Sequence, residues 1–276
     1  MIKPSHRLAL GFAQIGHTYT HLLTLLYPTV VLALEPEFGM SYGDLLVLMT
    51  LGNLLFGLGS LPAGWLGDKW SAAGMMVVFY LGMGLGCIAT GMASSPFGLT
   101  AGLALTGLAA SIYHPVGMAL LVRNADNRGR ALGLNGVFGS VGFASSGLLA
   151  GWLTDLINWR AAFLIPGAVS LATGVALAIL WRTGRVVDST LDRTPEPAPH
   201  RDAVIRAAIV MSVTMLCTGL IYHAYASGMP KIFAEHVPAL TGGSAAGAGT
   251  LVSLIFFAAM GAQLAGCICC RRRCCC

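Results

Sequence analysis

Four histidines lie inside long apolar segments of this 276-residue chain. His17 and His21 are four residues apart, so they lie on one face of a helix, whereas His114 and His223 lie in later apolar segments. Imidazole titrates near physiological pH, so such a group can pass protons or anchor a polar molecule. Ionisable side chains at this depth are candidates for function. The alternative is a set of neutral histidines that bond to carbonyl groups for packing.

Three further polar side chains accompany these histidines along the chain. Gln14 lies near the face of His17 and His21, Tyr113 precedes His114, and Asn135 belongs to another apolar segment. Each can add hydrogen bonds within a cavity, or can serve as a contact between helices. A pair of histidines at this spacing suits zinc, but no carboxylate or thiol accompanies it, so we expect no metal and no cofactor.

The composition requires these residues to be positioned by helices in a membrane. Only 10% of the residues are charged, whereas soluble domains carry about 25%. Hydrophobic residues make up 56%, and the mean hydropathy is +0.75. A soluble enzyme, a disordered regulator and a nucleic-acid-binding protein are excluded, because so much apolar surface must face lipid. Backbone groups in lipid need internal partners, so we expect an all-α, polytopic membrane helix bundle.

About eight apolar segments are long enough to cross a hydrocarbon core of roughly 30 Å. Basic residues precede the first segment as in a signal peptide, but its length and its lack of a cleavage site predict a retained helix. The expected segments are 8–34, 44–66, 72–92, 97–122, 131–154, 161–181, 204–229 and 244–268.

The basic residues are distributed unevenly between the loops. Fourteen of the 16 Lys and Arg fall on one side of the expected membrane, and only Arg160 and Lys231 fall on the other. By the positive-inside rule, both termini are cytoplasmic in a bacterial-type inner (plasma) membrane. Four acidic residues at the opposite ends of the segments are expected to be solvated loop charges: Glu35, Glu37, Asp155 and Glu235.

A polar linker divides the chain into two unequal parts. Residues 183–203 are rich in proline and charge, which is typical of a flexible linker. A shift of 202 residues places His21 on His223 and Pro28 on Pro230, so the segments after the linker look like a repeat of the first two. We therefore expect an N-terminal six-helix bundle in 1–182, a cytoplasmic linker in 183–203 and the first two helices of a second bundle in 204–266.

The loop after the second segment contains a motif of glycine, acid and base. Gly64, Asp68 and Lys69 lie in Gly-Trp-Leu-Gly-Asp-Lys, and Arg128 and Arg130 precede the fifth segment. This pattern resembles the signature loop of the major facilitator superfamily, whose two parallel six-helix halves are joined by a cytoplasmic linker. The resemblance implies that the glycine permits close packing and that the acid and bases gate the transport cycle. The alternative is an ordinary turn with a solvated ion pair.

A His-Pro pair and a glycine-rich helix resemble features of particular groups within this superfamily. Pro115 follows His114 in the fourth segment and should kink the helix. Together with His17, this pair resembles the fosmidomycin-resistance-like branch, whose members are efflux transporters generally taken to use the proton gradient. The small residues of the fifth segment resemble a motif of superfamily exporters that lets helices approach and flex, and simple close packing is the alternative: Gly139, Gly142 and Gly147.

The last ten residues, 267–276, contain only cysteine and arginine apart from one isoleucine. Cysteines beside arginines at a membrane edge can be lipidated or bind a soft metal, and a disulfide set is a second possibility. We favour a third interpretation, an aberrant tail written by a frameshift that truncates the second bundle. The expected continuation of the repeat, a second signature loop, is absent at this point.

These observations favour a secondary active transporter rather than an enzyme. The preferred function is proton-coupled efflux, as a drug-resistance antiporter, of small drug-like or metabolite molecules by alternating access, incomplete as this chain. The alternatives are uptake of an organic acid or sugar, and an inactive fragment or a metal or redox sensor that uses the cysteine tail. The expected partners are a small-molecule substrate, protons and the lipid bilayer, without nucleic acid; self-association stays open.

Overall fold

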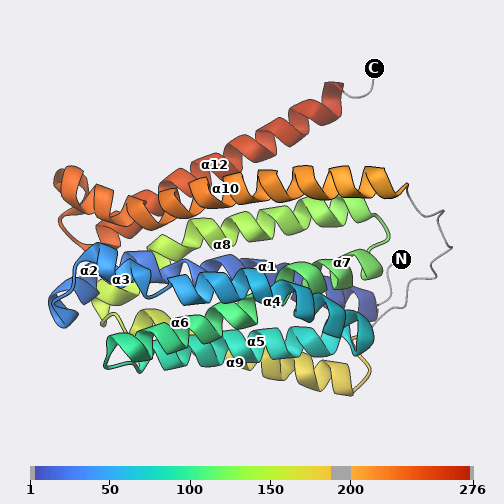
Figure 1. The fold of residues 1–276 in the computed structure, drawn as a ribbon, viewed down its shortest axis with the longest axis horizontal. Helices are drawn as coiled ribbons and strands as arrows, with labels where there is room; N and C mark the ends of the chain where they lie inside the picture. The colour runs from blue at the N-terminus through green and yellow to red at the C-terminus, as the bar shows by residue number, and fades with distance from the viewer. Residues whose placement is uncertain (1–3, 188–199, 274–276) are drawn as a thin grey trace.

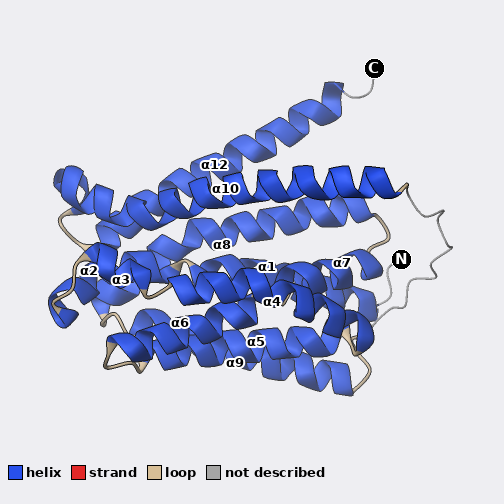
Figure 2. Cartoon of the chain, viewed as in Figure 1, coloured by secondary structure: helices blue, strands red, loops and turns tan. Residues whose placement is uncertain are grey.

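The computed structural model consists of packed helices (Figure 2). It describes residues 4–187 and 200–273, and for Pro4 and for 262–273 it describes the backbone only. Those residues contain helices and connecting turns without a β-strand. The prediction of an all-α helix bundle is therefore confirmed.

The helices follow one another along the whole chain. Their bounds are α1 Pro4–Thr24, α2 Leu26–Phe38, α3 Tyr42–Val47, α4 Thr50–Lys69, α5 Ala72–Gly91, α6 Pro96–Ala110, the π-helical turn η1 Tyr113–Gly117, α7 Met118–Asn124, α8 Arg128–Leu156, α9 Ala161–Arg182, α10 Arg201–His236, α11 Pro238–Thr241 and α12 Ala245–Arg273. Some neighbouring helices continue one another within a single span, namely α1 with α2, α3 with α4, and α6 with η1 and α7, and short loops connect most of the spans (Figure 1).

The described residues contain six helical segments that are long and apolar enough to cross a membrane. Two further segments bring the arrangement close to the expected eight. The first is divided at Leu25 into α1 and α2, because Pro28 has no N–H and its ring conflicts with the carbonyl of Thr24. The second is the apolar part of α12, Ala245–Gly261.

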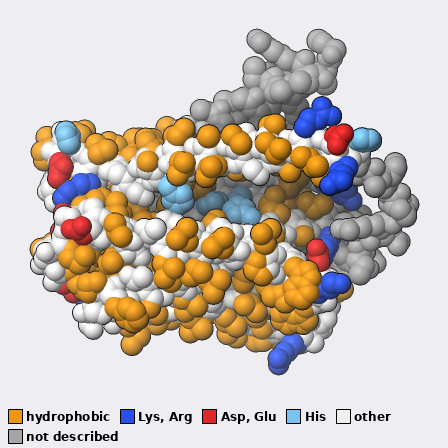
Figure 3. Space-filling view, viewed as in Figure 1, with side chains coloured by type: hydrophobic (Ala, Val, Ile, Leu, Met, Phe, Trp, Pro, Cys, Tyr) orange, Lys and Arg blue, Asp and Glu red, His pale blue; other side chains and the backbone are white. Residues whose placement is uncertain are grey.

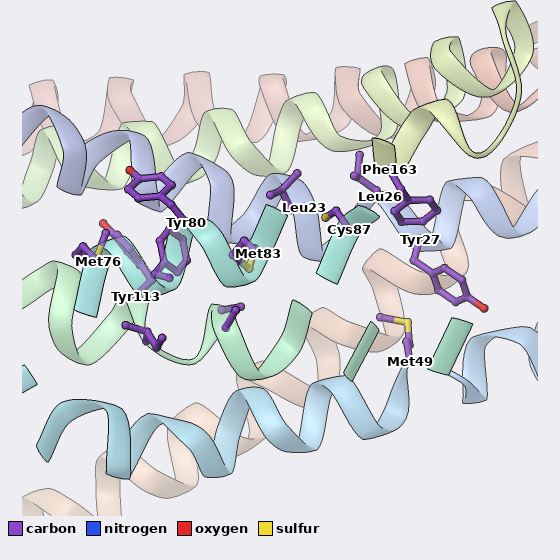
Figure 4. Close-up of a cluster of buried hydrophobic side chains, with 14 of the residues drawn as sticks. Leu23, Leu26, Tyr27, Met49, Met76, Tyr80, Met83, Cys87, Tyr113 and Phe163 are labelled. Carbon is purple, nitrogen blue, oxygen red and sulfur yellow. The ribbon is translucent and has the colours of Figure 1, made fainter. Parts of the chain in front are cut away.

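A core of large side chains joins the helices of the first part of the chain. Tyr27, Tyr80, Tyr113 and Phe163 are almost fully buried, and methionines fill the spaces between them (Figure 4). Helices α10 and α12 lie together along one side of this bundle, against α2 and α8 (Figure 1). The later helices therefore share one interface with the earlier ones.

Two sequence predictions concern segments at the margins of the structure. Residues 188–199 of the predicted linker lie outside the described residues, between the end of α9 at Arg182 and the start of α10 at Arg201. The side chains of the Cys/Arg tail also lie outside them, although the α12 backbone extends to Arg273.

Candidate functional site: a histidine cluster at an apolar cavity

Three of the four predicted histidines meet in one cluster. His17 and His21 come from α1, and His114 comes from η1. The ring centroids are 4.9 Å apart for His17 and His21, 5.5 Å for His17 and His114, and 5.7 Å for His21 and His114. One ring nitrogen from each lies within 4.8 Å of the other two. The three imidazoles can therefore act on a common ligand.

The orientation of His17 is set by Asn135 of α8. His17 Nδ1 lies 2.7 Å from the backbone carbonyl oxygen of Asn135. A carbonyl only accepts, so Nδ1 carries the proton, and Nε2 of the neutral ring keeps its lone pair. Tyr113 stacks on the His17 ring at 4.9 Å, and its hydroxyl donates to Asn135 Oδ1 at 2.9 Å. Asn135 and Tyr113 thus position a histidine instead of facing open space.

The π-helical turn places His114 beside α1. Pro115 cannot donate to the carbonyl four residues earlier, and the helix widens into η1 at this point. Gly64 of the signature loop permits the approach of α4, since a Cβ there would lie 3.2 Å from the Pro115 Cβ. His114 is the most exposed member of the cluster. Gly64 of the sequence motif therefore packs against Pro115, the residue next to His114.

Close packing of α8 against α1 completes the surroundings. A Cβ on Gly139 would lie 2.6 Å from His17 Cε1, and one on Gly142 would meet the backbone carbonyl of Thr18. The following residue, Phe143, stacks on the His21 ring at 3.8 Å. Phe143 was not among the predicted site residues, although its position directly after Gly142 indicates a side chain near that close contact.

The cluster faces a cavity of about 350 Å³ between the first helices and α10. His21 and His114 line it on one side, and Tyr222 and His223 line it from α10. Figure 3 shows histidine side chains in a hollow beside the long α10 helix. Most of the lining is apolar, and among the described residues that form it there is no Asp, Glu, Lys or Arg.

The other predicted site residues lie apart from the cluster. His223 faces the same cavity but is not among the three grouped histidines, and the half-buried Gln14 is not among the lining residues. Asp68 accepts from Arg123 at 2.6 Å, a partner the sequence reasoning did not assign, although both lie at the same expected membrane edge. The remaining basic residues of the gating motif are exposed: Lys69, Arg128 and Arg130.

The expectation that the outer acidic residues are solvated loop charges needs correction. Lys231 Nζ donates to both carboxylate oxygens of Glu35, at 2.7 and 2.9 Å. Glu37 accepts from Trp159 Nε1 at 2.5 Å and from Arg160 at 3.0 Å. Asp155 accepts from the backbone N–H of Ala246 at 2.7 Å. Only packing between distant segments creates these pairs, so local sequence does not indicate them.

The profile of the Major Facilitator Superfamily matches residues 18–268. The chain therefore belongs to this superfamily of membrane transporters, and it is an integral membrane protein and not an enzyme. This confirms the family predicted from the signature loop.

Curated relatives match parts of the chain. Puromycin resistance protein pur8 of Streptomyces alboniger is 33% identical over 63% of this chain and 36% of its own length. Inner membrane transport protein YnfM of Escherichia coli is 28% identical over 83% of this chain and 51% of its own. The chain thus spans about half or less of the length of these relatives.

A solved structure supports the fold. A bacterial homolog of the human lysosomal transporter Spinster, in an inward-facing and unoccupied conformation, superposes with a TM-score of 0.74 at 14% identity. The match covers 96% of this chain and 63% of that one. At this identity the likeness concerns the fold alone.

Proposed function

We propose that the chain belongs to a secondary active transporter that exports small amphiphilic molecules across a bacterial inner membrane in exchange for protons. The observation that carries the proposal is the apolar, histidine-lined cavity between the first helices and α10. Such a cavity between two helix groups is the site that alternating access exposes to each side in turn.

The chain divides into the parts that the sequence predicts. Residues 1–182 form the first bundle, 183–203 the cytoplasmic linker, and 204–266 the opening helices of the second bundle. The packing of α10 and α12 against α2 and α8 supports this division, because it sets the cavity at the boundary between the two parts. The Asp68 end is cytoplasmic, which agrees with the excess of basic residues there.

The lining favours a drug-like substrate over a sugar or an organic acid. Phe56, Phe143, Phe163 and Tyr222 supply aromatic surface for an apolar body, and the histidines supply a few polar contacts. The described lining offers no fixed cation to bind a carboxylate. The relative named for puromycin resistance and the His-Pro pair of the fosmidomycin-resistance-like branch support the same substrate class.

Histidine is the titrating group of the proposed exchange. The described lining contains imidazoles but no carboxylate, so His114, the exposed member of the cluster, is the first candidate to take up and release a proton. A positioned proton-transfer group accelerates its step by about 100-fold or more.

The test uses the full chain in liposomes that contain a pH-sensitive dye. Adding puromycin should move protons across the membrane, and His114→Ala should slow this flux about 100-fold. His236→Ala is the matched control, because His236 is exposed on α10 away from the cavity, and it should keep the flux. No puromycin-dependent proton movement would contradict proton-coupled export by this chain, and an unchanged flux in His114→Ala would show that this histidine does not couple protons to transport.

A further inference from the structure

His17, His21 and His114 also have the arrangement of a metal-ligand set. The sequence provided only a pair of histidines, and the absence of a third ligand argued against a metal. The fold supplies that third ligand from η1, more than 90 residues further along the chain. We propose that the three imidazoles bind a late first-row divalent transition metal ion, such as Zn²⁺ or Co²⁺, at the edge of the cavity.

The donor chemistry suits these ions. Neutral imidazole nitrogen is a preferred ligand for zinc, copper and nickel, whereas magnesium and calcium prefer oxygen. Three histidines with one position left open form the arrangement of zinc sites that also bind water or another ligand. The open position here faces the cavity, where water or an anionic group of a small molecule completes the coordination.

The spacing requires only a small closure. Zinc–nitrogen bonds of about 2.0–2.1 Å in a tetrahedral site place the ligand nitrogens about 3.4 Å apart. The three nitrogens already lie within 4.8 Å of one another. Rotation of the side chains can close the remaining distance, because His114 is exposed to the cavity and has room to turn.

A supporting contact of the type found behind metal ligands is already present. A metal-binding histidine usually donates its other ring N–H to a carbonyl or carboxylate, which fixes the ring and directs the free nitrogen to the ion. His17 does this through Nδ1 and the carbonyl oxygen of Asn135 at 2.7 Å. Its Nε2 is then the available ligand atom.

The local charge permits an ion to enter. The described cavity lining contains no Lys or Arg that would repel a cation. No other ligand set competes among the described residues, because they contain only this one group of three or more His, Cys, Asp and Glu side chains with metal-binding spacing. The proposal concerns binding alone, so it is tested separately from transport.

The experiment titrates Co²⁺ into the purified full chain in detergent, with a purification tag that lacks histidine and with all thiols alkylated to silence the cysteine tail. One ion should bind per chain with the visible absorption of tetrahedral Co²⁺, and Zn²⁺ should displace it. His17→Ala, His21→Ala and His114→Ala should each weaken binding at least about 10-fold. His223→Ala, in the same cavity, and His236→Ala, on the surface, are the controls and should bind as the unaltered chain does.

A second measurement needs no substitution, so it does not depend on the folding of a variant. Diethyl pyrocarbonate modifies accessible imidazoles, and mass spectrometry locates the modified residues. Zn²⁺ should protect His21 and His114 at least 10-fold while His236 reacts as before. Equal reaction with and without Zn²⁺, or equal Co²⁺ binding by the unaltered chain and a variant lacking all three histidines, would overturn the proposal.

Discussion

The two ends of the helix bundle hold α10 in different ways. At the Glu35 end, Lys231 of α10 pairs with Glu35 of α2, and the Tyr42 hydroxyl donates to the backbone carbonyl of Ser227 at 2.7 Å. At the Asp68 end, the Asp68–Arg123 pair joins α4 to α7 within the first bundle. Residues 201–218 of α10 are exposed there, whereas Ala226, Met229 and Pro230 near the other end are buried.

This difference indicates which end of the cavity is closed. At the Glu35 end, an ion pair and buried packing fasten α10 to the first bundle. At the Asp68 end, the described residues of α10 form no such contacts with the first bundle. Under the proposed alternating access, this state is open toward the Asp68 end. The contacts of Lys231 would then have to break on movement to the opposite state, which is the role of a gate.

Removal of Lys231 should have the largest effect on this difference. Lys231→Ala leaves the half-buried Glu35 without its cation, and such a loss costs about 2 kcal/mol or more. The Glu35 end should then open, and a cysteine placed at Ser227 should react with a membrane-impermeant maleimide roughly 10- to 30-fold faster.

Two further variants separate gating from unfolding. Glu235 is the other partner of Lys231, and its side chain is exposed. Glu235→Gln should therefore change the labelling rate little. The exchanged pair Glu35→Lys with Lys231→Glu should return the rate toward the original value. If Lys231→Ala is labelled at the same rate as the unaltered chain, the contacts of Lys231 do not act as a gate.

A larger residue at Gly147 should disturb the contact of α8 with α12. A Cβ at Gly147 would lie 2.8 Å from the carbonyl oxygen of Gly249. Gly147→Leu should therefore separate these helices and lower the thermal stability by about 1–3 kcal/mol. Gly133→Leu on the same helix is the control, because a Cβ there meets nothing within 4 Å. Equal melting temperatures of the two variants in detergent would contradict close packing at this interface.

The smallest effect is expected at the Asp68 end. The Asp68 carboxylate is largely exposed, so its ion pair with Arg123 contributes at most about 1 kcal/mol to stability. Asp68→Asn should shift the melting temperature only slightly and should leave the labelling at Ser227 unchanged. A loss of stability as large as that of Gly147→Leu would contradict the small contribution expected of this exposed ion pair.

The sequence predicted the helices and the histidines because both depend on local patterns. Apolar length defines the segments, and His114 with Pro115 marks an interrupted helix in any fold. The pairing of Glu35 with Lys231 and the stacking of Phe143 on His21 could not be predicted, because they join residues separated by more than 100 positions. The helix break before Pro28 could have been predicted, because the proline ring conflicts with the backbone carbonyl four residues earlier.

Distances between paired spin labels test most directly whether the two ends of the bundle open in turn around the histidine-lined cavity. One pair of labels replaces Val47 and His236 near the Glu35 end, and another replaces Lys69 and Arg206 near the Asp68 end; all four residues are exposed. On addition of puromycin to the full chain in lipid, the first distance should lengthen while the second shortens. Distances that stay unchanged, or that move in the same direction, would contradict alternating access about this cavity.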